Sequence, residues 1–368
     1  MSRLPLDPRH GTHEPTTTVP ARAPGSVRRT TSIDILRPNG VDAELVLVGR
    51  ARDLLTDADG NPHALDTAAV EATIDFVDAQ RVTAISSTPA IPGLEQLIGR
   101  SASTGFRAAI NTAIDVGRDG AGAGHDVVGR PVYQLLDDLP VVTLISGYAP
   151  QHARAESGTW ADEQKRKPLQ KTAPEGLAML QQADLCAGWK AGGTIMQGFA
   201  ENNPPVVTGP AAPSLDVVDD PLAWHELPGP LPVHGMRRRR RIDVQPVDDG
   251  PSSGGLVWEV DAHFRDSYVD DEGETVVHEY TVLARVDATT ATVLQALATP
   301  RVLPWFECPE AAASAGRLAG RTLESLRAGV RAEFLGASTC THLNDMLRAL
   351  ADVAVLGRGV VTPAVRLP

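Results

Sequence analysis

The residues best suited to chemistry in this sequence are its cysteines and a few histidines of the C-terminal half. The stretch STCTHLNDML places Cys340 two residues before His342, in a chain of 368 residues with only three cysteines. Cys308 lies in WFECPEAAAS, and His278 lies in VVHEYTV. Zinc readily accepts thiolate and imidazole ligands, and a thiolate can also act as a nucleophile. The sequence therefore suggests either a zinc site or a cysteine nucleophile.

Both of these cysteines are expected at helix starts. Pro309 suits the first position of a helix and leaves Cys308 at the cap, while Cys340 precedes a helix that Thr339 or Thr341 would cap. Helix N-termini favour anions and lower the pKa of a thiol placed there. A Cys-x-His pair can point at one atom only before the backbone becomes helical, because inside a helix the side chains diverge by about 200°. The predicted helix start meets that condition.

In the metal interpretation, Cys308, Cys340, His342 and His278 form a candidate four-ligand set for zinc, with His263 on the preceding predicted strand as another candidate. A zinc ion with three protein ligands and one open position polarises a carbonyl or activates water. The expected reaction on a small-molecule substrate is then hydrolysis or carbon–carbon cleavage.

In the nucleophile interpretation, Cys340 attacks an acyl substrate, and His342 or His278 is the base that activates its thiol. Asp345 or Glu279 would orient that base, and the reaction would be acyl transfer. Each carboxylate has a simpler interpretation, which we favour: Asp345 lies in the first turn of a helix and suits its dipole, and Glu279 is a solvated strand residue. A third interpretation is non-catalytic, a binding or scaffold protein with structural cysteines.

Composition limits the partners and the compartment. The chain has 46 acidic and 34 basic residues, and its net charge of -12 argues against nucleic acid as a partner. No apolar run approaches about 18 residues, so no membrane segment is expected. The first 25 residues lack the apolar core of a signal peptide, and the odd cysteine count does not suit a disulfide framework. We expect a cytoplasmic protein with reduced thiols.

Short matches recur in the same order about 210 residues apart. RRTTSIDILRP from Arg28 answers RRRRRIDVQP from Arg237, ARDLLTDADG answers FRDSYVDDEG, and YQLLDDL answers THLNDML. These matches predict a duplicated domain, with a pseudo-twofold arrangement like that of a homodimer fused into one chain. The predicted organisation is a disordered tail, a first copy, a proline-rich linker and a second copy, at residues 1–25, 26–200, 201–235 and 236–368.

The predicted class is α+β, each copy being an antiparallel sheet packed against two or three helices. In the second copy, alternating apolar residues predict strands at 255–271, 274–287 and 290–298, and helical spacing predicts helices within 308–334 and 341–357. The arginine run at 237–241 falls at the first strand, and we interpret it as a solvated sheet edge. The glycine-rich stretch 117–126 lacks the context of a phosphate-binding loop and is expected to be a flexible loop.

The first copy lacks the candidate site. Val132 and Gln134 stand at the positions of Cys340 and His342, Val70 stands at that of His278, and nothing answers Cys308. The sequence therefore predicts at most one complete site.

Four motifs of the second copy are shared with a known family: RRRRRID, HEY with His278, ECPEAA with Cys308, and CTHLNDMLRALADV with Cys340. On these motifs, residues 236 to about 357 resemble a bacterial family known only as a domain of unknown function, DUF2889, and residues 26–190 resemble it faintly. The resemblance implies no particular activity.

That family closes with an Asp-x-Cys-His-Ala motif, which is missing from the end of this chain. Its counterpart is DLCAGW in the first copy, where Cys186 is retained and Ala187 replaces the histidine. The pseudo-dimer suggests a hypothesis, in which Cys186 of the first copy reaches the site of the second and completes it.

Overall fold

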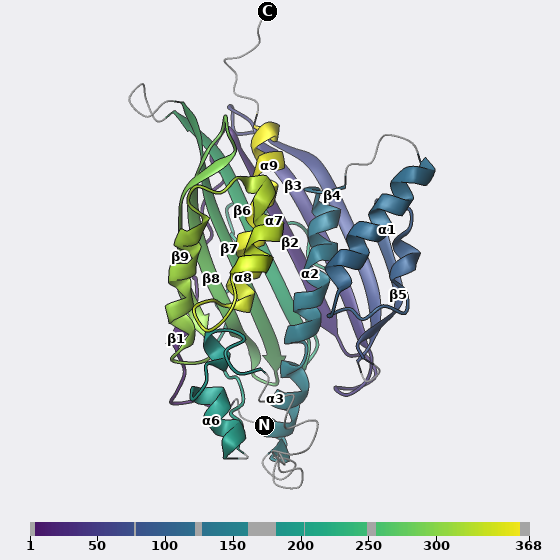
Figure 1. Ribbon diagram of the computed structural model, residues 1–368, viewed down its shortest axis with the longest axis vertical. Helices are drawn as coiled ribbons and strands as arrows, with labels where there is room; N and C mark the ends of the chain where they lie inside the picture. The colour runs from purple at the N-terminus through teal and green to yellow at the C-terminus, as the bar shows by residue number, and fades with distance from the viewer. Residues whose placement is uncertain are drawn as a thin grey trace, which may run out of the picture.

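The computed structural model describes residues 4–76, 79–121, 127–160, 182–201, 203–248 and 255–360. Its main feature is one nine-stranded antiparallel sheet with the order β1-β9-β8-β7-β6-β2-β3-β4-β5 (Figure 1). The strands are β1 Thr12–His13, β2 Ser26–Leu36, β3 Leu45–Thr56, β4 Pro62–Asp75, β5 Arg81–Thr88, β6 Met236–Asp248, β7 Leu256–Asp270, β8 Gly273–Asp287 and β9 Thr292–Leu303.

The three strands predicted in the second half are confirmed as β7, β8 and β9. They form because apolar and β-branched residues alternate along them, which gives each strand a face to bury. The tight turn between β7 and β8 ends at Gly273, whose φ of 122° favours glycine.

The two halves of the chain share one sheet. β2 and β6 are antiparallel neighbours at its centre, with Val27 opposite Val244 and Ile35 opposite Met236, and each begins a four-stranded meander that runs outward. A single cluster of buried apolar side chains extends through both halves. The fold is thus a mixed α/β structure with a large antiparallel sheet.

Helices cover one face of this sheet (Figure 1). They are α1 Phe106–Ala121, α2 Pro131–Ile145, α3 Tyr148–Glu156, α7 Leu326–Glu333, α8 Thr341–Ala349 and α9 Val353–Gly359. Shorter elements are η1 Leu94–Leu97, η2 Ala187–Trp189, α6 Thr194–Ala200, η3 Cys308–Leu318, η4 Leu323–Ser325 and η5 Leu350–Asp352. No helix within the described ranges is long and apolar enough to cross a membrane.

The helical predictions are confirmed with local corrections. The predicted helix at 308–334 consists of the 3₁₀ helices η3 and η4 followed by α7, and the residue at the cap of η3 is Glu307 rather than Cys308. The glycine-rich stretch 117–126 is helical as far as Ala121, where α1 ends, instead of forming a loop. Residues 122–126 of that stretch lie outside the described ranges.

Two extended segments cover the opposite face. Residues 4–25, part of the predicted disordered tail, follow a defined path: β1 pairs with β9, and the Thr16 amide donates to Glu279 on β8. Residues 203–235, within the predicted linker, also lie against the sheet, with a bridge between Ala211 and Thr275 and a buried Trp224. Backbone hydrogen bonds to the sheet supply the order that composition alone does not predict.

The arginine run at 237–241 does not form a solvated edge. It lies on β6, the central strand between β2 and β7, and all five of its arginines are buried. Successive side chains point to opposite faces, so Arg238 and Arg240 point toward the helices and the other three toward the extended segments. The prediction was wrong because residues distant in the sequence supply the counter-charges.

Candidate metal centre

A β-bulge between β7 and β8 positions the first two residues of the candidate centre. The register shifts between Asp266 and Ser267, so that Asp266 pairs with His278 and Ser267 pairs with Val276. Bulges bend the strand locally and can re-aim side chains, and they are frequent beside active sites. Here both Asp266 and His278 are buried beneath the helix layer.

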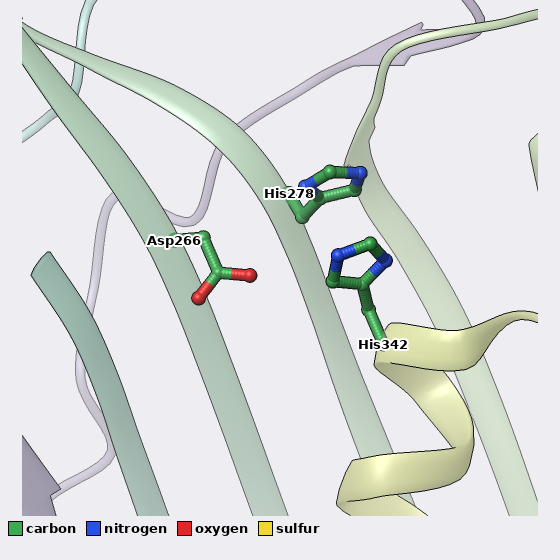
Figure 2. A group of neighbouring side chains, drawn as sticks. All are labelled: Asp266, His278 and His342. Carbon is green, nitrogen blue, oxygen red and sulfur yellow. The ribbon is translucent and has the colours of Figure 1, made fainter. Parts of the chain in front are cut away.

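His342, in the first turn of α8, completes the group. Its ring stacks on that of His278, with centroids 3.8 Å apart and an interplanar angle of 19°. One potential ligand atom from each of Asp266, His278 and His342 lies within 4.8 Å of the other two. Figure 2 shows the Asp266 carboxylate beside the two stacked rings, so three side chains, from β7, β8 and α8, face one another.

Both imidazoles are held in the neutral form, which is the form that binds metals. Burial lowers the pKa of His278 well below its ordinary value, with a further contribution from His342. Burial and the nearby Arg238 guanidinium lower the pKa of His342 to about 3. Among the described residues, neither His278 Nδ1 nor His342 Nε2 has a hydrogen-bond partner. Each ring therefore keeps a buried nitrogen without a partner.

Arg238 fixes the carboxylate of the group. Its Nε and Nη2 atoms donate to the two Asp266 oxygens at 2.7 and 3.0 Å, and its Nη1 donates to Asp345 on α8 at 2.8 Å. Ligand carboxylates in metal sites are commonly held by such hydrogen bonds. One guanidinium thus ties Asp266 on β7 to the helix that carries His342.

The Arg238 contacts belong to a larger buried network of six arginines and six aspartates between the sheet and the helices. Its members are Arg29, Arg107, Arg238, Arg240, Arg327, Arg348, Asp53, Asp137, Asp138, Asp266, Asp345 and Asp352. Equal numbers of both signs let these charges stay buried, since an unpaired charge there would be far more costly.

The cysteines lie next to the Asp266 group. Cys340 Sγ is 4.0 Å from His342 Nδ1, and the buried Tyr280 hydroxyl lies beside the Cys340 thiol. Cys308 and Cys186 flank Gly188: a Cβ added there would lie 3.1 and 4.0 Å from their sulfur atoms. The η2 turn that carries Gly188 is held by a hydrogen bond from the Ala187 amide to the Thr339 carbonyl, at 2.8 Å.

The electrostatic setting of the thiols is the reverse of the expected one. Burial raises the pKa of Cys340 to about 12, and burial with the neighbouring cysteines raises the pKa of Cys308 well above its ordinary value. The helix start at Cys340 is confirmed, but Cys340 is itself the N-cap, and no side chain caps the helix, so the predicted Thr339 or Thr341 cap was wrong. Burial outweighs the favourable effect of the helix end.

Three other predicted roles change. His263 faces the opposite side of the sheet, where it pairs with Glu279 at 3.0 Å. Glu279 is fully buried, bound by His263 and Arg265, so its interpretation as a solvated strand residue was wrong. Asp345 is buried as well, and it accepts hydrogen bonds from three arginines in place of serving a helix dipole: Arg107, Arg238 and Arg240.

The first half has a comparable place without histidines. The β3–β4 pair shifts register after Asp53, which lies opposite Asp66, just as β7–β8 shifts after Asp266 opposite His278. By this register Asp66, and not Val70, occupies the position that corresponds to His278. Arg29 binds Asp53 through two hydrogen bonds, and Arg130 binds Asp66 in the same way. Ion pairs fill this place, so it offers no imidazole ligand.

Two residues of this region are not among the predicted site residues. Asp266 lies in one of the repeated motifs, and the Arg-Asp dipeptide that recurs in both halves is a signal that could have identified it. His10 lies in the segment predicted to be disordered. It is buried, close enough to His278 to lower the pKa of that residue, and both of its ring nitrogens lack partners among the described residues. No pattern in the sequence indicates that contact.

The comparisons with known proteins concern the second half. Residues 236–356 match the model of a family described as "Protein of unknown function (DUF2889)". This match confirms the resemblance of that half, and the matched range contains Asp266, His278, Cys308, Cys340 and His342. No curated protein and no solved structure matches the chain.

Proposed function

We propose that the chain is an enzyme with a single metal centre formed by Asp266, His278 and His342, with zinc as the candidate ion and a small carbonyl or acyl compound as the substrate. The observation that carries the proposal is the convergence of three buried potential ligand atoms within 4.8 Å of one another. Two imidazoles and one carboxylate leave an open position on the ion, which is the pattern of catalytic rather than structural zinc.

The chemistry of the group fits a metal in two respects. The imidazoles are neutral and each has an unpartnered nitrogen, and Arg238 holds the carboxylate while leaving it free lone pairs. Ligand atoms on a tetrahedral zinc lie roughly 3.3 Å apart, so the group would have to contract around an ion, and the two stacked rings would have to turn out of their parallel arrangement to direct a nitrogen each at it. When bound, zinc would polarise a carbonyl or activate water, which supports hydrolysis or carbon–carbon cleavage.

The cysteines lie next to the metal centre in this proposal. Cys340, whose Sγ lies 4.0 Å from His342 Nδ1, borders the group without being one of its three ligands, and Cys186 and Cys308 lie close to each other beside Gly188. A cysteine nucleophile acting without metal is the second candidate function. It is less favoured because a raised Cys340 pKa and a lowered His342 pKa both oppose a thiolate–imidazolium pair. The non-catalytic alternative is a binding or scaffold protein with structural cysteines, in which any bound ion would be structural as well.

We further infer that the two halves arose by tandem duplication and are related by a pseudo-twofold axis between β2 and β6. Two reciprocal ion pairs support this inference. Arg28 binds Asp243, and Arg237 binds Asp34, as expected if equivalent strands pair antiparallel across such an axis. On this view the first half has kept the Arg-Asp pair and has Asp66 at the described position that corresponds to His278.

The test is elemental analysis of the full-length protein after dialysis against zinc. About one zinc per chain is expected, with loss of zinc in His278→Ala and in His342→Ala. Asp53→Asn is the matched control, because it breaks the corresponding Arg-Asp pair of the first half and should leave zinc bound. If no zinc binds, or if both histidine variants keep it, the metal centre is refuted.

Catalysis is tested with p-nitrophenyl acetate as an activated acyl probe. The metal centre predicts hydrolysis that disappears with a chelator and in His342→Ala and that survives in Cys340→Ser. Loss in Cys340→Ser with no effect of the chelator would instead favour the nucleophile. Zinc binding without hydrolysis of this or other carbonyl probes would favour the structural ion.

A further inference from the structure

A groove separates the helices of the two halves, on the outer side of the helix layer. It consists of two adjoining cavities of about 390 and 650 Å³, bounded by α1 and α2 on one side and by α7 and α8 on the other. Arg107, Arg331 and Arg348 line both cavities, so the two cavities are immediate neighbours. Clefts of roughly 300–1,000 Å³ are the usual size for small-molecule sites.

The smaller cavity has an unusual apolar wall. Leu144, Leu185 and Leu335 line it, and these leucines are 54%, 59% and 66% exposed. Exposed leucines are common singly, but three around one cavity form a contiguous apolar surface that water covers at a cost. The wall would suit an alkyl chain.

The charges in the groove favour an anion. Four arginines and three aspartates line the two cavities, in a chain whose net charge is -12: Arg107, Arg327, Arg331, Arg348, Asp115, Asp137 and Asp345. Arg107, Arg327 and Arg348 are already paired with Asp137 or Asp345, so these charges offset one another within the groove. Arg331 is exposed and has no ion-pair partner within the described part of the chain. It is the cation left to bind a ligand.

A buried donor beneath Arg331 points to the same conclusion. Arg348 is 94% buried, yet its Nε atom has no hydrogen-bond partner among the described residues. Buried donors are nearly always satisfied, by protein, water or ligand.

We propose that this groove binds a small amphipathic carboxylate, with its alkyl chain against the three leucines and its carboxylate on Arg331. A carboxylate accepts two parallel hydrogen bonds from a guanidinium, which fixes its position. Thr341 and Asn344 border the groove and flank His342 along α8, so a bound ligand would lie against the first turn of that helix. The proposal does not depend on a metal ion.

The experiment is calorimetric titration of the full-length protein with decanoate, alongside decanol and acetate. Decanoate is expected to bind more tightly than either comparison compound, since only decanoate offers both groups. Arg331→Gln is expected to raise the Kd for decanoate by about tenfold or more, because a charge-assisted hydrogen bond is lost. Arg358→Gln is the matched control, as Arg358 is an exposed arginine on α9 that lines neither cavity.

A second variant tests the apolar wall. Leu335→Gln should weaken the binding of decanoate and leave the binding of acetate unchanged. The proposal is overturned if decanoate binds no better than acetate, or if Arg331→Gln and Arg358→Gln bind it equally well. Zinc content measured on the same samples keeps the two proposals apart. Decanoate binding that depends on Arg331 in a protein without zinc supports the groove and refutes the metal centre.

Discussion

Asp345→Asn tests the idea that the buried charge network holds α8, and with it His342, on the sheet. Asp345 accepts hydrogen bonds of 2.6, 2.8 and 2.7 Å from Arg107, Arg238 and Arg240. Asparagine has nearly the same shape but no charge, so the variant leaves three arginines short of one counter-ion. Removing one partner of a buried pair typically costs about 3–5 kcal/mol. Each arginine here keeps a second aspartate, so we expect about 3 kcal/mol.

The pKa of Asp345 gives an independent magnitude. Despite burial, which raises it, the surrounding arginines lower the pKa from 3.8 to about 2. A tenfold change in an ionisation constant corresponds to about 1.4 kcal/mol, so the ionised carboxylate contributes about 2 kcal/mol. Because the pKa in the folded state is the lower one, this contribution is fully present above about pH 5 and is lost as the pH falls from about 4 to 2.

The assay is urea unfolding of the wild type and Asp345→Asn between pH 2 and pH 7. The difference in unfolding free energy should be largest at neutral pH and should shrink toward pH 2. Glu71→Gln is the control, because Glu71 and Arg50 are 58% and 34% exposed in their ion pair and such pairs contribute at most about 1 kcal/mol. Equal destabilisation in the two variants, or a difference that does not change with pH, would refute the reasoning.

Two further predictions concern the same layers of the fold. Asp138→Asn should destabilise the protein far less than Asp345→Asn at pH 8. Burial raises the pKa of Asp138 to about 7, and one of its oxygens has no partner among the described residues. Urea unfolding of both variants at pH 8 is the measurement. Gly209→Ala should detach residues 203–235 from the sheet, because the added Cβ would collide with the Val276 carbonyl. We expect this collision to lower the free energy of unfolding by about 1–3 kcal/mol. Limited proteolysis should then cut that segment faster than in the wild type or in Gly316→Ala, whose added Cβ meets nothing within 4 Å.

The strands and the start of α8 were predictable because each leaves a local trace in the sequence. Apolar residues alternate with a period of two along β7, β8 and β9. The residues that follow Cys340 have helical spacing, which predicts a helix start at that position. The association of His278 with His342 was also proposed from the sequence, and the two rings stack.

The misplaced residues depend on contacts that have no local trace. Five consecutive arginines give the same pattern at a solvated edge and at a buried centre, and the difference lies in Asp266 and Asp345, which are far from Arg238 in the chain. The role of Asp266 depends in addition on a one-residue bulge, which sets the partner that it faces. Sequence patterns predict which residues form a strand, but they do not predict which distant side chains neutralise the charges on that strand.

The comparison between the halves bears on whether the two histidines serve the fold or a function. The first half keeps the bulge and the Arg29–Asp53 pair, and it fills the position of His278 with Asp66, whose charge Arg130 neutralises. The scaffold can therefore be completed without any imidazole. In the second half the same scaffold holds two buried rings, each with an unpartnered nitrogen, and leaving a buried polar group unpaired costs about 1–3 kcal/mol. Since the first half forms the same scaffold without this energetic cost, stability of the fold does not explain the two histidines. A metal ion bound by both unpartnered nitrogens would remove the cost and would give the histidines a function.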